Sequence, residues 1–148
     1  MTAPMVYVLF PGTAREALTF YAGVFGGELS LHTKGDFGSG GPPDAIAHGV
    51  LDGVVTLAAA DAGGQDNSVQ LEGLMLSLLG TAEPDVLHNW FDQLADGGRI
   101  VDPLMPKPWG ASDGQVVDRY GLHWLIGYEP AAGSAGEPAT EKVGPREP

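Results

Sequence analysis

Apolar residues along this chain recur at two spacings, and each change of spacing marks a new strand or helix. Residues 5–10 are apolar and rich in β-branched and aromatic side chains, and Pro11-Gly12 ends the run, so a first strand is predicted. Thr13 and Glu16 have the spacing of a capping box that starts a helix, which Gly26-Gly27 ends. Its expected inner face, with members three and four positions apart, is Ala14, Ala17, Leu18, Tyr21 and Phe25.

The middle of the chain predicts three more strands. Residues 28–33 form the first, and residues 34–44 form a loop because they hold four glycines and two prolines. Apolar runs at 45–51 and 54–60 flank Asp52-Gly53, a pair typical of a two-residue type I′ turn, so they predict a β-hairpin. A glycine-rich loop follows at 61–67.

The second half begins with a predicted strand at 72–79 and a helix capped by Thr81 or Glu83, with Pro84 in its first turn. Gly97-Gly98 ends this helix. Its apolar stripe is Val86, Leu87, Trp90, Phe91 and Leu94. A second hairpin is expected around residues 118–121, where Asp118 and Gly121 have ordinary turn chemistry.

The two halves repeat each other. Leu18, Tyr21 and Phe25 match Leu87, Trp90 and Leu94 at a constant offset, and the double glycines and hairpins follow in the same order. Each half therefore has the order βαβββ. The predicted fold is α+β, with one domain at residues 1–128 built from modules at about 5–60 and 72–128, and residues 129–148 form a tail rich in Pro, Ala, Gly and Glu that is expected to be disordered.

Composition narrows the possible functions. The absence of cysteine excludes disulfides, thiolate nucleophiles and cysteine-ligated metals. A formal charge of −12 with only seven Lys and Arg argues against nucleic acid as a partner and suits a neutral or cationic ligand. No apolar run is long enough for a membrane span, and residues 1–10 do not resemble a signal peptide, so the expected location is the cytoplasm.

Several motifs in this order resemble the PhnB-like branch of the glyoxalase/bleomycin-resistance/dioxygenase (vicinal oxygen chelate) superfamily. The resemblance spans about residues 5–128 and implies tandem βαβββ modules that form a cupped mixed sheet. The matching residues are Glu16 to Tyr21, Phe25 to Glu28, His48, Pro106, Trp109-Gly110, Gly114, Asp118-Arg119-Tyr120-Gly121 and Trp124.

The resemblance also locates the metal-ligand positions of the superfamily's enzymes. They fall here near Val6, residues 57–59, residues 75–77 and Ile126, and none of these offers His, Asp or Glu, even with a register error of one residue. The chain is therefore expected to bind no metal and to use no cofactor.

Among the four histidines, His48 is the candidate ligand contact. His32 and His88 are expected at the surface, and His123 on the opposite face of its strand from Trp124. His48 lies mid-strand, where a polar group needs a partner, so a structural role and a ligand contact both remain open. It matches a histidine typical of PhnB-like sequences. Trp124 is expected in the core, whereas Trp109, in a loop between prolines and glycine, can lie at a cavity mouth.

The predicted binding site is a concave pocket lined by His48, Met75, Ser77 and Trp109, with the loops at 34–44 and 61–67 closing over it. The predicted function is metal-independent binding of a small organic molecule by a homodimer. The alternative is an enzyme of unknown reaction on a small metabolite, with His48 as acid/base and Ser77 or Tyr7 as hydrogen-bonding groups. No second catalytic group is visible, which disfavours the enzyme.

Overall fold

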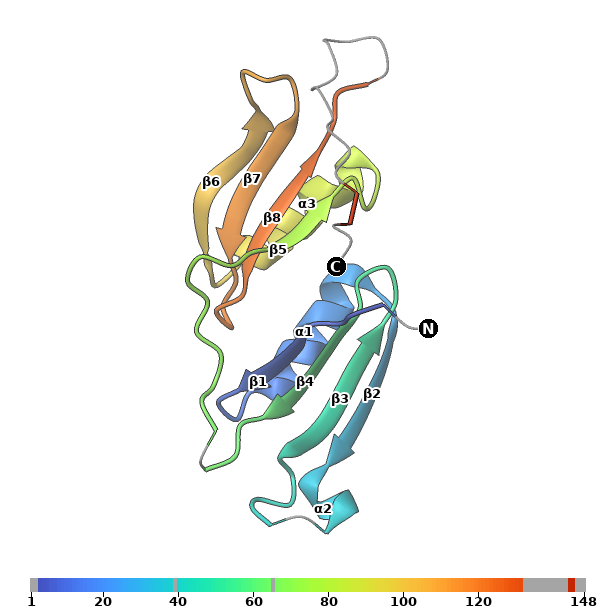
Figure 1. The fold of residues 1–148 in the computed structure, drawn as a ribbon, viewed down its shortest axis with the longest axis vertical. Helices are drawn as coiled ribbons and strands as arrows, with labels where there is room; N and C mark the ends of the chain where they lie inside the picture. The colour runs from blue at the N-terminus through green and yellow to red at the C-terminus, as the bar shows by residue number, and fades with distance from the viewer. Residues whose placement is uncertain (1–2, 39, 65, 132–143, 146–148) are drawn as a thin grey trace.

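A computed structural model describes residues 3–38, 40–64, 66–131 and 144–145, and its elements fall into two groups (Figure 1). The first group is β1 (Tyr7–Phe10), α1 (Ala14–Phe25), β2 (Glu28–Thr33), α2 (Lys34–Phe37), β3 (Ile46–Asp52) and β4 (Leu57–Asp61). The second group is β5 (Leu76–Leu79), α3 (Pro84–Ala95), β6 (Arg99–Pro106), β7 (Ser112–Val117) and β8 (His123–Tyr128). We call them the first and second modules.

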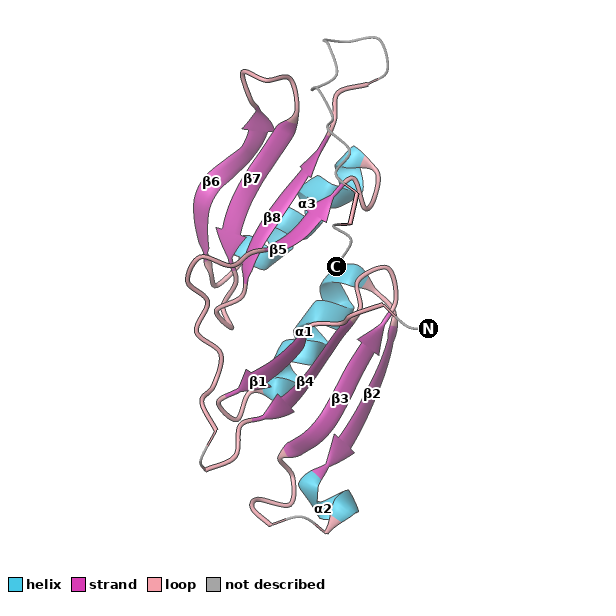
Figure 2. Ribbon diagram, in the orientation of Figure 1, coloured by secondary structure: helices cyan, strands magenta, loops and turns pink. Residues whose placement is uncertain are grey.

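Each module is a four-stranded mixed sheet (Figure 2). The strand orders are β1-β4-β3-β2 and β5-β8-β7-β6, so the two sheets have the same topology. The first strand of each module pairs parallel with the last, and the other pairs are antiparallel. The predicted α+β fold with a repeated βαβββ unit is confirmed.

Both long helices lie on the same side of the sheets, behind them in Figure 1. They meet at the module junction, where the ring centroids of Phe25 and Trp90 are 5.0 Å apart and those of Tyr21 and Trp124 are 5.8 Å apart. The predicted inner face of α1 is buried throughout, and Trp124 is in the core as expected. Among the residues that the structure describes, no helix lies over the other side of either sheet, and we call that side the open face.

A buried carboxylate joins the modules across this junction. Oδ2 of Asp118 accepts hydrogen bonds from the Tyr21 hydroxyl at 2.6 Å and from Trp124 Nε1 at 2.8 Å. Its Oδ1 accepts from the backbone N–H groups of Tyr120 and Leu122. Burial and the neighbouring Asp118 raise the pKa of Tyr21, so this phenol keeps its proton. The sequence analysis interpreted Asp118 as a turn residue. That role explains the hydrogen bonds that Oδ1 accepts, but not the one that Oδ2 accepts from Tyr21 of the other module.

The predicted capping box at Thr13 and Glu16 is wrong. No side-chain hydrogen bond from Thr13 caps α1. Instead, Oδ1 of buried Asp61 accepts from the Ala14 N–H at 2.9 Å, while its Oδ2 accepts from the Ile46 N–H at 2.8 Å. A residue 47 positions away satisfies the helix end, which local spacing does not reveal.

Other local predictions also need correction. Residues 34–44 are not wholly irregular, because Thr33 and Asp36 form a capping box that starts the short helix α2. The turn between β3 and β4 spans residues 53–56 rather than two residues. Strand β5 begins at Leu76 rather than residue 72, and Val86, assigned to the apolar stripe of α3, is 36% exposed.

Within the described ranges, no helix is long and apolar enough to cross a membrane. Most of the predicted tail, residues 132–143 and 146–148, lies outside the described residues.

Candidate functional site

His48 lies on the open face of the first sheet and contacts Tyr7. The Tyr7 Oη atom is 3.0 Å from Nδ1 of His48, and the two rings are stacked with centroids 5.6 Å apart. They meet across β4, where Tyr7 is paired with Ala58 and the next open-face residue is Ala60. Because both intervening side chains are single methyl groups, the two larger rings can touch above the strand.

This pair can donate and accept protons at a ligand. Burial raises the pKa of Tyr7, so its hydroxyl stays protonated at neutral pH. When that hydroxyl donates to Nδ1, the proton of neutral His48 is on Nε2. The contact also gives His48 the partner that a polar side chain in mid-strand requires.

A hollow of about 350 Å³ adjoins His48 on β2 and β3, and its lining is polar at both ends. The strand register places Glu28 opposite Asp52 and His32 opposite His48. One end therefore carries two carboxylates and the other two imidazoles. The full lining is Glu28, Ser30, His32, His48, Val50 and Asp52.

The other histidines are placed largely as predicted. His123 is on the opposite face of β8 from buried Trp124, with its Nε2 3.0 Å from Oε1 of Gln115. His88 on α3 has its Nε2 2.9 Å from the Tyr128 hydroxyl. His32 packs its ring near Phe37.

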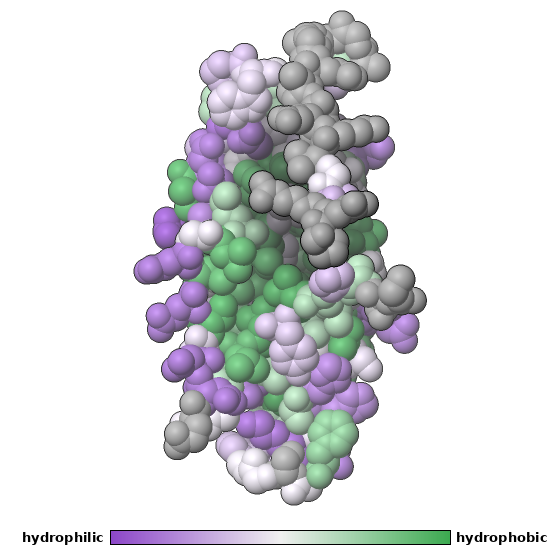
Figure 3. Space-filling view, viewed as in Figure 1, coloured by the Kyte–Doolittle hydropathy of each residue, from purple (hydrophilic) through white to green (hydrophobic). Residues whose placement is uncertain are grey.

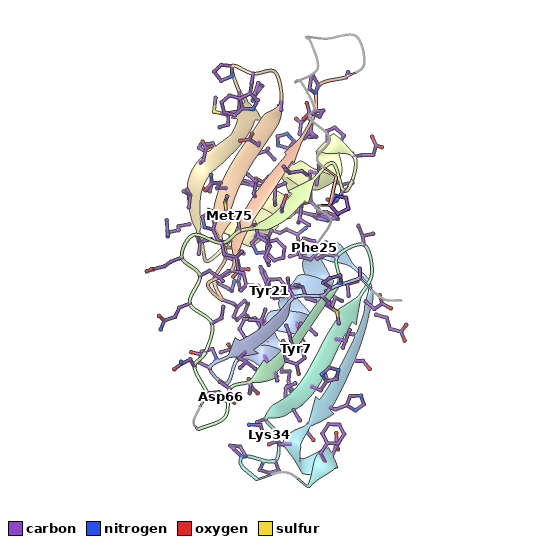
Figure 4. All side chains as sticks on the ribbon, viewed as in Figure 1. Tyr7, Tyr21, Phe25, Lys34, Asp66 and Met75 are labelled. Carbon is purple, nitrogen blue, oxygen red and sulfur yellow. The ribbon has the colours of Figure 1, made fainter. Side chains whose placement is uncertain are left out.

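Within a single chain, the four residues of the predicted pocket lie in different parts of the structure. Ser77 is exposed on β5, and Met75, 38% exposed, immediately precedes that strand. Trp109 is 68% exposed in the β6–β7 turn and lines a separate hollow on the second module. Met75 and Tyr7 are labelled in Figure 4 on opposite sides of the module junction. The single chain brings together His48 and Tyr7 but does not place Trp109 in the His48 hollow.

The described residues contain no group of three or more His, Cys, Asp or Glu placed to hold a metal ion. The positions at which the superfamily resemblance locates metal ligands are those of Val6, Leu57 to Ala59, Met75 to Ser77 and Ile126. None of these is a usual ligand of zinc or iron.

A family model described as the Glyoxalase/Bleomycin resistance protein/Dioxygenase superfamily matches residues 5–126. The chain belongs to this superfamily. Protein YjdN of Escherichia coli (strain K12) is 26% identical to it over 138 residues, covering 81% of this chain and 90% of that protein.

Solved structures of superfamily relatives have the same fold. Protein PA1353 from Pseudomonas aeruginosa is 31% identical, with a TM-score of 0.76 over 88% of this chain and 99% of that one. A protein from Bacillus cereus, described as a putative 3-demethylubiquinone-9 3-methyltransferase, PhnB protein, is 22% identical, with a TM-score of 0.67 over 86% of this chain and 99% of that one. The chain thus shares its fold with a structure described as a PhnB protein.

Sequence reasoning on this superfamily member missed most of the side chains around its predicted site residues. Glu28, Ser30 and Asp52 line the His48 hollow, and Asp113 and Glu129 line the Trp109 hollow. Alternation along β3 could have placed Asp52 on the same face as His48. The register with β2, which sets Glu28 opposite Asp52, is decided by pairing between strands that local sequence does not encode.

Proposed function

We propose that this chain is a metal-independent small-molecule-binding protein that holds its ligand on the open sheet face and acts as a homodimer. The observation that carries the proposal is the Tyr7–His48 pair beside a hollow of about 350 Å³. Ligand sites are typically concave surfaces with a few polar groups that fix orientation. Here a stacked phenol and imidazole supply those groups at a surface that neither long helix covers.

Exposed apolar side chains on the same side support the proposal. The space-filling view shows an apolar surface where the two modules meet (Figure 3). Exposed apolar residues on the two sides of this junction are Val6 and Tyr7, just before and at the start of β1, and Leu74 and Met75, in the segment before β5. A junction hollow of about 270 Å³ lies between β1 and that segment. Apolar surface of this kind favours binding of a ligand or of another chain.

The His48 hollow gives the first test. A thermal-shift screen of small organic molecules should yield hits, and His48→Ala should weaken them by about tenfold or more, the effect of losing one well-placed polar contact. Tyr7→Phe should weaken them less, because ring stacking survives. His88→Ala is the matched control, since it removes another histidine bonded to a tyrosine hydroxyl but lies outside the His48 hollow, and it should leave the affinity of hits that bind in that hollow unchanged.

Two results would contradict this assignment. Hits whose affinity is the same in wild type and His48→Ala would place the site elsewhere. A fall of several degrees in the melting temperature of ligand-free His48→Ala, with ligand affinity retained, would make His48 a structural residue.

The dimer is a separate prediction. Strand β5 is at the edge of its sheet, and Leu79 on this strand is 53% exposed. Unpaired edges and apolar faces are commonly protected by association. Sedimentation at micromolar concentration should show a dimer that Leu79→Glu converts to monomer. Val54→Glu, a charge added at a 68% exposed hairpin residue, should leave the dimer intact. A wild-type monomer would refute the prediction.

The Tyr7–His48 contact also favours a second candidate function, an enzyme that uses His48 as acid/base on a small metabolite. A protonated phenol bonded to an imidazole is a workable proton donor and acceptor pair. Ser77, considered as a third group, lies on the other module. Mass spectrometry of screening hits incubated with the protein distinguishes the two candidates, because only the enzyme forms a product that His48→Ala abolishes.

A further inference from the structure

Trp109 is held exposed by a well-braced turn. It is 68% exposed, whereas Trp90 and Trp124 are buried in the core at 5% and 1%. Within the turn, the Gly110 N–H donates to the Lys107 carbonyl at 3.0 Å and the Lys107 N–H donates to the Ala111 carbonyl at 2.8 Å. Exposing an indole costs hydrophobic free energy, so a turn built to present one calls for a ligand or partner.

An ion pair fixes the base of the same turn. Lys107 Nζ donates to both carboxylate oxygens of Asp102, at 2.9 and 2.8 Å. The Lys107 side chain is only 12% exposed. The pair braces the turn and holds the Lys107 charge against Asp102, so this charge is not available to an anionic ligand.

The hollow beside Trp109 has a volume of about 350 Å³ and combines aromatic and acidic groups. Asp113 on β7 and Glu129 after β8 contribute carboxylates, and Tyr128 is also among the lining residues. Leu79 supplies an apolar wall, and no Lys or Arg is among the lining residues. An indole face beside carboxylates attracts organic cations through the ring quadrupole and through direct charge attraction.

We propose that this hollow is a binding subsite for an organic cation, a quaternary or protonated amine, with Trp109 as the platform and Asp113 and Glu129 as counter-charges. The inference rests on the proposed small-molecule-binding function and names the charged class of its ligand. The carboxylates Glu28 and Asp52 in the His48 hollow and the net charge of −12 fit the same class. A volume of about 350 Å³ accommodates a small amine without rearrangement of the turn.

The test uses choline and its uncharged isostere, in which a tert-butyl group replaces the trimethylammonium group. Heteronuclear NMR of the full chain reports on Trp109 directly, because Trp109 is the exposed one of the three tryptophans and has its own indole N–H resonance. This resonance is assigned as the one that is missing in Trp109→Phe. Choline should shift this resonance and leave those of Trp90 and Trp124 in place. The isostere should bind at least about tenfold more weakly, since it keeps the shape and loses the charge.

Two charge-neutralising variants separate local recognition from the protein's overall charge. Asp113→Asn with Glu129→Gln should weaken choline by about tenfold or more, whereas Glu72→Gln with Asp92→Asn makes the same change in net charge at exposed positions outside the hollow and should have little effect. Trp109→Ala should abolish the site.

Several outcomes would overturn the inference. Equal affinity for choline and the isostere, or equal loss in both paired variants, would mean that the hollow does not recognise a cation. A Trp109→Ala protein that changes from dimer to monomer would assign Trp109 to contact with a second copy. Neutral hits that bind through His48 while choline leaves Trp109 unaffected would refute the cation subsite and leave the proposed function standing.

Discussion

Replacement of Asp118 by alanine is expected to destabilise the protein by about 3–5 kcal/mol, a large share of the stability of an ordinary domain. The substitution leaves four donors without their acceptor: the Tyr21 hydroxyl, the Trp124 indole N–H and the N–H groups of Tyr120 and Leu122. Asp118 is only 3% exposed, so water reaches these groups poorly. Urea unfolding of the purified variant measures the loss.

The repeat supplies a matched control. Asp52 ends β3 in the first module as Asp118 follows β7 in the second, but it is exposed, and its side chain accepts a long hydrogen bond of 3.5 Å from the Thr56 hydroxyl. Asp52→Ala should change stability by less than about 0.5 kcal/mol. Tyr21→Phe removes one donor and should cost about 1–2 kcal/mol. Equal effects of Asp118→Ala and Asp52→Ala would show that the buried network does not join the modules.

Gly98→Ala is expected to cost about 3 kcal/mol or more, because an added Cβ would lie 2.2 Å from the carbonyl oxygen of Val117 and 2.9 Å from Cα of Asp118. Both clashing atoms are backbone, so relief requires the turn after α3 and the hairpin after β7 to separate. Gly27 makes the corresponding close backbone approach in the first module, where an added Cβ would lie 2.6 Å from the Asp52 carbonyl oxygen. The second glycine of each pair is therefore a site of close backbone approach.

Gly23 is the contrasting position. It lies inside α1, and a Cβ added there meets nothing within 4 Å. Gly23→Ala should stabilise the protein by about 0.5–1 kcal/mol through helix propensity. Thermal unfolding of the two variants should thus shift in opposite directions. A Gly98→Ala protein as stable as wild type would mean that the hairpin yields to the added methyl group.

Local patterns in the sequence were sufficient for the two long helices and most strands, but not for the short helix α2. The spacing of Leu18, Tyr21 and Phe25 fixes which side of α1 faces inward, and that side is buried. The double glycines mark both helix ends, and β2 has its predicted bounds. The repeat of these patterns predicted the confirmed α+β fold, because each βαβββ unit must bury one face of its sheet under its own helix.

The sequence by itself therefore determined the two long helices, the order of the strands and the main apolar side of each long helix, since these depend on residues a few positions apart. Only the tertiary structure decided which polar groups meet. Asp61 caps a helix 47 positions away, Asp118 bonds Tyr21 of the other module, and Tyr7 reaches His48 across an alanine strand. Such contacts depend on strand register and module packing, which many distant residues set together. For the same reason His48 and Trp109, both singled out from sequence, lie in two separate hollows.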